Sequence, residues 1–168
     1  MGEPVASNSG SGSANRPGRS PMRVVDAFAD VRSLFLDTAP VIYYVESVSP
    51  FREIMDVAVA GARAGRIELV TSPITLAECL VHPFRKGDLD LVQRFRLTIT
   101  RGTNTRYAGI DGLAEEAAAL RAQLNLSLMD AFQVVCARAA GADAFLTNDQ
   151  ALTRVSDLKI IVLSTLEL

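Results

Sequence analysis

Short apolar segments alternate with longer helix-like segments along most of this chain, and this alternation limits the fold more than any other feature. The apolar segments have the length of buried strands and lie at residues 33–36, 67–71, 144–147 and 160–163. Between them, typical helix starts and stops are found at Ser49-Pro50, Ser72-Pro73, Ser127, Gly65 and Gly141. Strands separated by helices are joined by right-handed crossovers, which place the strands in parallel. The sequence therefore predicts an α/β fold in which helices cover both faces of a central parallel sheet.

The helical segments are placed by the same start and stop signals. We expect helices at residues 50–64, from 73 onward, 88–97, 111–124 and 127–140, with a helical turn at 151–155. Residues 102–107 are expected to form a loop or a short extended segment. In an open parallel sheet, ligands bind beyond the carboxyl ends of the strands, which is where Asp37 and Asp149 fall.

The composition separates the first residues from the rest of the chain. Of 168 residues, 49% are hydrophobic and 21% are charged, a balance typical of one globular domain. Residues 1–29 are rich in Ser, Gly and Pro and cannot bury enough apolar surface to become ordered. We therefore expect a disordered N-terminal tail at 1–29 and one domain at 30–168. No apolar run reaches the roughly 18 residues of a membrane span, and no secretory signal pattern opens the sequence, which indicates a cytoplasmic protein that binds no membrane.

Four carboxylates stand at the ends of predicted elements or within apolar runs. They are Asp37, Glu78, Asp130 and Asp149. Burying one carboxylate beside apolar neighbours is unfavourable, and gathering four is worse because like charges a few ångströms apart do not all stay ionised. A divalent cation would resolve this conflict, and hard oxygen ligands suit Mg²⁺ or Mn²⁺.

Each acid also has a purely structural interpretation. Asp37 could be a turn residue or the cap of a helix that begins near Pro40. Asp130 fits a capping box that begins at Ser127. Glu78 could face water at the edge of its helix, and Asp149 could belong to a polar turn after a strand. No single acid is specific evidence for a metal site, so the metal hypothesis depends on the four acids together.

The cysteines and the one histidine do not point to other chemistry. Cys79 and Cys136 lack metal-ligand spacing and lie in apolar helical patterns, which indicates buried thiols. His82 precedes Pro83 and is expected in a loop. With one histidine, a nucleophilic triad or a zinc site is hard to assemble.

Charge is distributed unevenly along the chain. The net charge is −2, which argues against a protein that coats nucleic acid by bulk charge. Between His82 and Tyr107, however, two acids face six basic residues, namely Arg85, Lys86, Arg94, Arg96, Arg101 and Arg106. This segment is either a solvated helix face or a rim that contacts phosphates, where Tyr107 could stack on a base.

The acids and their neighbours resemble the PIN-domain nucleases, and most of all the single-domain VapC toxins of VapBC toxin–antitoxin pairs. The resemblance covers residues 33–168 in order. Its motifs are a strand ending in Asp37-Thr38, the segment Ser72-Pro73-Ile74-Thr75-Leu76-Ala77-Glu78, the segment Ser127-Leu128-Met129-Asp130-Ala131, and Phe145-Leu146-Thr147-Asn148-Asp149. Ala39 departs from the pattern, because many relatives carry Asn or Ser there.

This resemblance implies a three-layer α/β/α PIN-like fold for the domain at 30–168. It also implies an Mg²⁺- or Mn²⁺-dependent ribonuclease, a hydrolase of RNA phosphodiester bonds, built on the acids at 37, 78, 130 and 149. Thr147 matches the hydroxyl residue that orients a ligand or water in the family. Such proteins are usually homodimers, and as toxins they are neutralised by an antitoxin whose tail enters the active-site groove.

The expected chemistry is metal-assisted phosphodiester hydrolysis, in which Asp37, Asp130 and Asp149 hold the ion and Glu78 completes the site or orients water. Three alternatives remain open. The chain could be a catalytically inactive PIN-like module that binds RNA or protein, or a housekeeping PIN nuclease without an antitoxin. It could also be a phosphatase on a doubly wound sheet, although the Asp-x-Asp signature is absent after Asp37.

Overall fold

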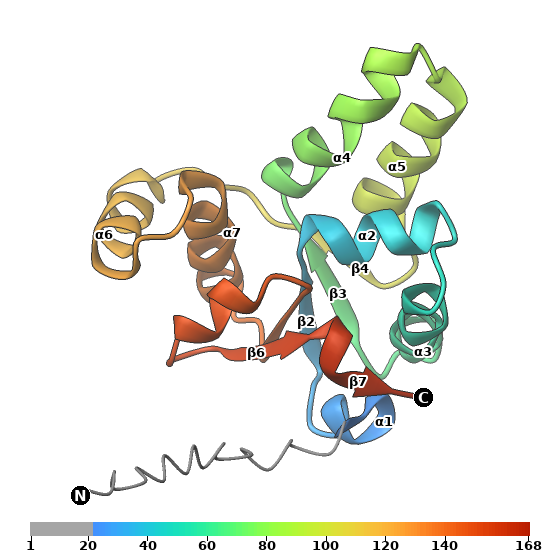
Figure 1. Ribbon diagram of the computed structural model, residues 1–168, viewed down its shortest axis with the longest axis horizontal. Coiled ribbons are helices and arrows are strands. Elements are labelled where there is room, and N and C mark those ends of the chain that lie inside the picture. The colour runs from blue at the N-terminus through green and yellow to red at the C-terminus, as the bar shows by residue number, and fades with distance from the viewer. Residues whose placement is uncertain (1–21) are drawn as a thin grey trace, which may run out of the picture.

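Five parallel strands form the central sheet of the computed structural model, which describes residues 22–168. The strands are β2 (Ser33–Leu36), β3 (Glu68–Thr71), β4 (Thr105–Tyr107), β5 (Ala144–Thr147) and β6 (Lys159–Val162). Their spatial order is β4-β3-β2-β5-β6, and every neighbouring pair is parallel (Figure 1). β2 and β5, which carry the predicted site at their carboxyl ends, are therefore adjacent at the middle of the sheet.

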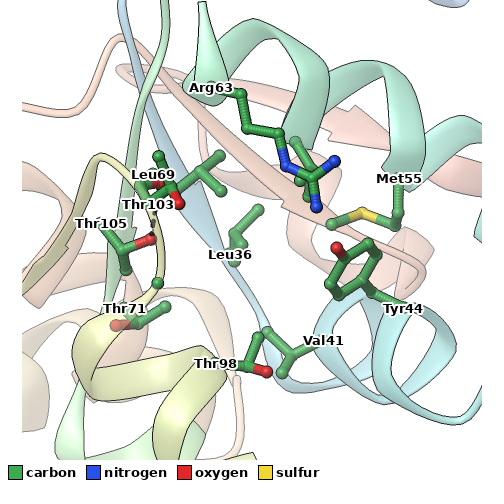
Figure 2. A pocket seen from close by; sticks show the side chains of 12 residues that line it. Leu36, Val41, Tyr44, Met55, Arg63, Leu69, Thr71, Thr98, Thr103 and Thr105 are labelled. Atoms are coloured by element: carbon green, nitrogen blue, oxygen red, sulfur yellow. Dashed lines mark hydrogen bonds between the residues drawn. The ribbon is translucent and has the colours of Figure 1, made fainter. Parts of the chain in front are cut away.

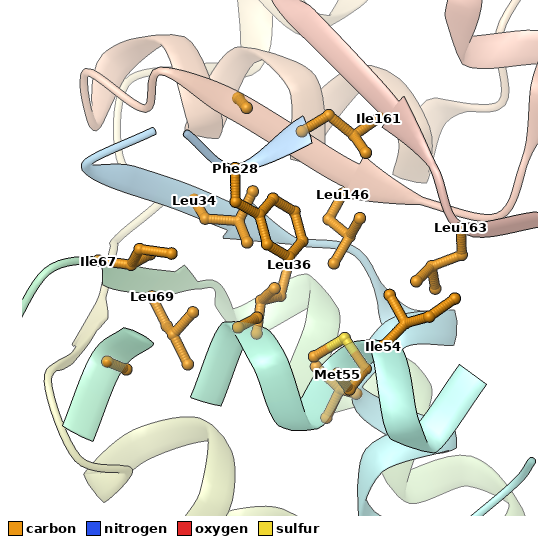
Figure 3. Close-up of a cluster of buried hydrophobic side chains, with 14 of the residues drawn as sticks. Phe28, Leu34, Leu36, Ile54, Met55, Ile67, Leu69, Leu146, Ile161 and Leu163 are labelled. Carbon is orange, nitrogen blue, oxygen red and sulfur yellow. The ribbon is translucent and has the colours of Figure 1, made fainter. Parts of the chain in front are cut away.

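Helices cover both faces of this sheet, as the sequence predicted. Leu34 and Leu36 of β2 face a large apolar cluster with residues of α1 (Val24–Ala27), α2 (Thr38–Val45), α3 (Phe51–Arg63), α4 (Pro73–Lys86) and α5 (Leu89–Arg101) (Figure 3). Phe35 faces the opposite side, where the second cluster includes α6 (Ala114–Leu124) and α7 (Leu128–Ala139). Successive strand residues point to opposite faces, so the short strand β2 contributes apolar side chains to both clusters. The three-layer α/β/α arrangement is confirmed.

On the face covered by α6 and α7, two aromatic side chains pack across the centre of the sheet. Phe35 and Phe145 stack with their ring centroids 5.0 Å apart, and both side chains are fully buried. These residues pair in register across β2 and β5, so the contact also aligns the strand ends that follow. The carboxyl ends of the two strands are thereby held side by side.

The predicted N-terminal tail is partly wrong. Residues 1–21 lie outside the described part of the chain, but Met22–Arg23 form β1, which pairs in parallel with β7 (Leu166–Glu167). The next residues form α1, and Val24, Ala27 and Phe28 are buried in the larger apolar cluster. This burial depends on a strand at the far end of the chain, so local composition did not indicate it.

Several element bounds differ from those expected. His82 lies within α4 and not in a loop, because the helix continues through Pro83 to Lys86 and Pro83 is buried. Burial of that face outweighs the backbone hydrogen bond that Pro lacks. α5 extends to Arg101, and the short extended segment predicted near residues 102–107 is the edge strand β4. Two 3₁₀ helices, η1 (Gln150–Arg154) and η2 (Leu163–Thr165), complete the fold.

The cysteines are buried as predicted. Cys79 is 2% exposed and Cys136 is fully buried, and desolvation raises the pKa of both thiols. Neither side chain is suited to act as a nucleophile, because a reactive thiol needs a lowered pKa and solvent access.

Among residues 22–168, no helix combines the length and the apolar character that crossing a membrane requires.

Candidate active site

Two of the four predicted acids lie at the carboxyl ends of β2 and β5, and each caps the element that follows. Asp37 is the N-cap of α2, where its Oδ1 accepts a hydrogen bond of 2.7 Å from the Thr38 backbone N–H. Asp149 caps η1, because its Oδ1 accepts from the Ala151 backbone N–H at 2.8 Å. The capping interpretation of Asp37 is therefore correct, and it also directs this carboxylate to the edge of the sheet where ligands bind.

Thr147, the last residue of β5, connects these two acids. Its buried hydroxyl donates to Asp37 Oδ2 at 2.6 Å and accepts from the Asp149 backbone N–H at 2.9 Å. Because Thr is β-branched, its χ1 rotamer is restricted, which makes the hydroxyl a fixed donor. In this structure Thr147 orients Asp37.

Glu78 reaches the same place from α4. Ser72 caps this helix by accepting from the Thr75 backbone N–H at 3.2 Å, and Pro73 follows in the first turn, as the sequence predicted. Glu78 then lies in the second turn and is partly buried. Its Oε2 accepts from the Thr38 hydroxyl at 2.5 Å. One oxygen of Glu78 is thus directed at the end of β2, while the side chain stays half-buried at the edge of its helix.

Asp130 lies at the start of α7 and interacts with its helix cap. Ser127 Oγ accepts from the Asp130 backbone N–H at 3.0 Å, and the Ser127 hydroxyl donates to Asp130 Oδ2 at 2.5 Å. The predicted capping interaction is present. Asp130 is also close enough to Asp37 for its charge to raise the Asp37 pKa, so capping and proximity to the other acids coexist.

Replacement of Ser127 by Ala is expected to lower the stability of the protein by about 1 kcal/mol, because α7 loses its N-cap acceptor. Urea denaturation followed by far-UV circular dichroism measures this, since the chain has no Trp for fluorescence. Ser156→Ala, at an exposed loop position, is the matched control and is expected to unfold like the wild type. Equal stabilities of the two variants would show that the cap is not important.

Gln133 is the part of the site that the sequence did not reveal. It is 1% exposed, in α7, and its amide Nε2 donates to Asp37 Oδ1 at 3.0 Å and to Glu78 Oε2 at 3.1 Å. The available signal was its position three residues after Asp130, because residues three apart share a helix face. A single amide thus touches carboxylates that arrive from two different elements.

Burial perturbs the Asp37 carboxyl. Its pKa is raised to about 6, chiefly by desolvation and to a smaller extent by the charges of Asp130 and Glu78, while hydrogen bonds from Thr147 and Thr38 oppose the rise. Among the described residues, no ion pair includes any of the four acids. The ion pairs present are Arg52–Asp56, Arg106–Glu68, Arg138–Glu116 and Arg138–Asp157. The negative charge at this edge of the sheet is therefore not balanced by a side-chain cation.

The chemistry of these residues fits a hard divalent cation. Within residues 22–168, no protein group donates a hydrogen bond to Glu78 Oε1, Asp130 Oδ1 or Asp149 Oδ2, whereas the other oxygen of each carboxylate is held. Carboxylate oxygens of this kind suit Mg²⁺ or Mn²⁺. In the same described region, no three His, Cys, Asp or Glu side chains converge closely enough to hold one ion. The donor set fits, while the side-chain positions are those of a metal-free protein.

The six basic residues of the predicted phosphate rim have different environments. Arg106 pairs with Glu68 at 3.0 Å and donates to the Ala140 carbonyl at 2.7 Å, while Arg94 donates to the Val45 carbonyl. These two side chains support the fold. Arg85, in contrast, is exposed on α4, seven residues and about two turns beyond Glu78 on the same helix face.

A cavity with a mixed apolar and polar lining lies elsewhere, beside α2. It has a volume of about 130 Å³ and is lined by side chains from α2, α3, α5 and the neighbouring strands, including Val41, Met55 and Leu69 (Figure 2). None of the four acids lines it. This cavity is therefore separate from the four acids.

Comparison with known proteins agrees with this geometry. The PIN domain family matches residues 34–158, which is most of the chain, so the protein belongs to the PIN domain family. No curated protein matches the sequence.

Solved structures with the same fold share little sequence with it. VapBC2 of Rickettsia felis, bound to a promoter DNA fragment, is 15% identical over 77% of this chain and 98% of that chain, with a TM-score of 0.60. DNA-bound VapBC of Salmonella typhimurium is 17% identical over 79% and 98% of the two chains, with a TM-score of 0.56. VapC20 of Mycobacterium tuberculosis, described as a Sarcin-Ricin loop cleaving toxin, is 16% identical over 67% and 86%, with a TM-score of 0.55.

Proposed function

We propose that this protein is a divalent-metal-dependent ribonuclease that hydrolyses RNA phosphodiester bonds. The observation that carries the proposal is the buried Asp37 carboxylate, which shares a hydrogen-bond network with Glu78 at the carboxyl edge of the sheet and has no side-chain cation among the described residues. Membership of the PIN domain family and the likeness to VapC20, a toxin named for cleaving RNA, support this activity.

The proposed ligands of Mg²⁺ or Mn²⁺ are Asp37, Asp130 and Asp149, with Glu78 either as a further ligand or as the residue that orients water. When bound, the cation supplies Lewis-acid polarisation of the phosphodiester and lowers the pKa of the attacking water. Thr147 holds Asp37 Oδ2 in place at 2.6 Å. Glu78 Oε1, which accepts no hydrogen bond from residues 22–168, would be available to accept a proton from the attacking water.

We further propose that the protein is the toxin of a type II toxin–antitoxin pair and acts in the cytoplasm as a homodimer. The support is its fold, which it shares with chains of the VapBC complexes from Rickettsia felis and Salmonella typhimurium. The antitoxin would be the partner that limits RNA cleavage in the cell. Copurification of a small protein encoded beside the gene, with loss of nuclease activity in the complex, tests this part.

The nuclease proposal is tested by incubating the purified protein with a mixed RNA pool in Mg²⁺, in Mn²⁺ and in EDTA. Cleavage is expected with either metal and is expected to stop in EDTA. Fragment ends then identify the preferred sites. A folded protein that binds RNA but cleaves none of it in either metal would favour the inactive PIN-like binding module.

A further inference from the structure

Gln133 is the only buried residue of α7 with an amide, hydroxyl or charged side chain. The other buried residues of this helix are Ala131, Val134, Val135, Cys136 and Ala137. Burying an amide is unfavourable unless its donors and acceptor are hydrogen-bonded. An apolar side chain of the same volume would pack at this position with less penalty, so the amide has another role.

The hydrogen bonds of Gln133 define that role. Its Nε2 carries two N–H groups, which lie 3.0 Å from Asp37 Oδ1 and 3.1 Å from Glu78 Oε2. Thr38 Oγ1 is slightly farther, at 3.3 Å, and its own hydroxyl donates to Glu78. One N–H is therefore available for each carboxylate, and the amide spans the gap between them.

The amide is held in this orientation from its other side. Gln133 Oε1 accepts from the Thr75 hydroxyl at 3.1 Å, and Thr75 is itself fixed beside Ser72 at the start of α4. The reversed amide would direct its oxygen at two carboxylates, which repel it. The two carboxylates, which can only accept, thus select the orientation in which Gln133 donates to them. The Thr75 hydroxyl, which also lies 3.3 Å from the Leu36 carbonyl, supports this orientation when it donates to Gln133 Oε1.

From this geometry we infer that Gln133 is a positioning residue of the nuclease site, which sets the separation of Asp37 and Glu78 for the cation and for the attacking water. The inference rests on the proposed function. Gln133 is 1% exposed, so it cannot contact RNA and acts only through the two acids. Outer residues that orient metal ligands typically contribute about 10- to 100-fold to metal affinity or activity.

Gln133→Met tests the inference, because Met has nearly the same length and flexibility but no N–H donor. We expect kcat for RNA cleavage to fall about tenfold or more, with KM within about threefold of the wild type. We also expect Mn²⁺ to bind about tenfold more weakly in calorimetry. Gln123→Leu, at an exposed position of α6, is the control and is expected to match the wild type in all three quantities.

A metal-free measurement separates this inference from the proposed function. In EDTA, the losses in Tm caused by Gln133→Met and Glu78→Met are expected not to add in the double variant, because each removes one partner of the same hydrogen bond. Additive losses would overturn the inference even if the wild type cleaves RNA.

A folded Gln133→Met variant with the kcat and the Mn²⁺ affinity of the wild type would overturn the inference as well. A wild type that neither binds Mn²⁺ nor cleaves RNA would instead overturn the proposed function, and the coupling in EDTA would still decide whether Gln133 joins the two acids. If Gln133→Met does not fold, the same measurements are made on Gln133→Leu, which also lacks the N–H donors.

Discussion

Asp37→Asn is expected to reduce metal-dependent RNA cleavage by about a hundredfold or more, because it removes the charge of the most buried acid in the proposed site. The fold should be retained. Asn Oδ1 still accepts from the Thr38 backbone N–H and from Gln133, whereas Asn Nδ2 faces the Thr147 hydroxyl, which can accept in place of donating. Cleavage rates in Mn²⁺, measured together with far-UV circular dichroism, check both halves of this expectation.

The control for this loss is Asp111→Asn, at an exposed loop position outside the site. It changes the net charge of the protein by the same amount, so any general weakening of RNA binding by charge appears equally in both variants. Cleavage by the control should match the wild type. An Asp37→Asn variant that cleaves RNA as fast as the control would remove Asp37 from the catalytic assignment.

The metal-free protein is expected to lose about 2 kcal/mol of stability as the pH rises from 4 to 7, through Asp37 alone. The pKa of Asp37 is about 6 in the folded protein and 3.8 when unperturbed. The folded state therefore binds more protons than the unfolded state between these values, and stability falls with rising pH. Each pKa unit corresponds to about 1.4 kcal/mol, so the complete shift is worth about 3 kcal/mol, most of which is lost between pH 4 and 7. The contribution is complete below pH 3.8 and lost above about 6.

Comparison with Asp37→Asn isolates this contribution from the other acids. Urea denaturation of both proteins in EDTA, at intervals between pH 4 and 7, gives the difference in unfolding free energy at each pH. The difference should change in favour of the variant as the pH rises, because Asn carries no charge that must be buried. A difference that stays constant across this range would contradict a raised pKa for Asp37.

Much of the fold could be predicted because its signals are local. β2 and β5 have the bounds that their apolar runs indicated, and α7 begins at the Ser127 cap. The exceptions arose where distant residues decided the outcome. β1 exists because it pairs with β7, whose residues lie more than a hundred positions away. Likewise α4 continues through Pro83 because the face that includes Pro83 is buried, which a local pattern does not show.

The candidate site was predictable to a similar degree. The acids at 37 and 149 could be placed because the carboxyl ends of adjacent parallel strands meet at one edge. The role of each individual acid was harder to predict from the sequence. Each acid had both a structural interpretation and a site interpretation. In the structure, Asp37 and Asp149 cap the helices that follow them, and Asp130 accepts a hydrogen bond from Ser127, the cap of α7.

By itself, the sequence determined the alternation of strands and helices, the start signals at Ser72 and Ser127, and the position of each acid at the end of an element or on a helix face. These features depend on residues a few positions apart, so periodicity and capping reveal them. Only the tertiary structure decided that Gln133 joins Asp37 and Glu78, across 96 and 55 positions of the chain. Such a contact requires the crossovers that bring α4 and α7 to the end of β2, and no local pattern specifies the distance between those helices.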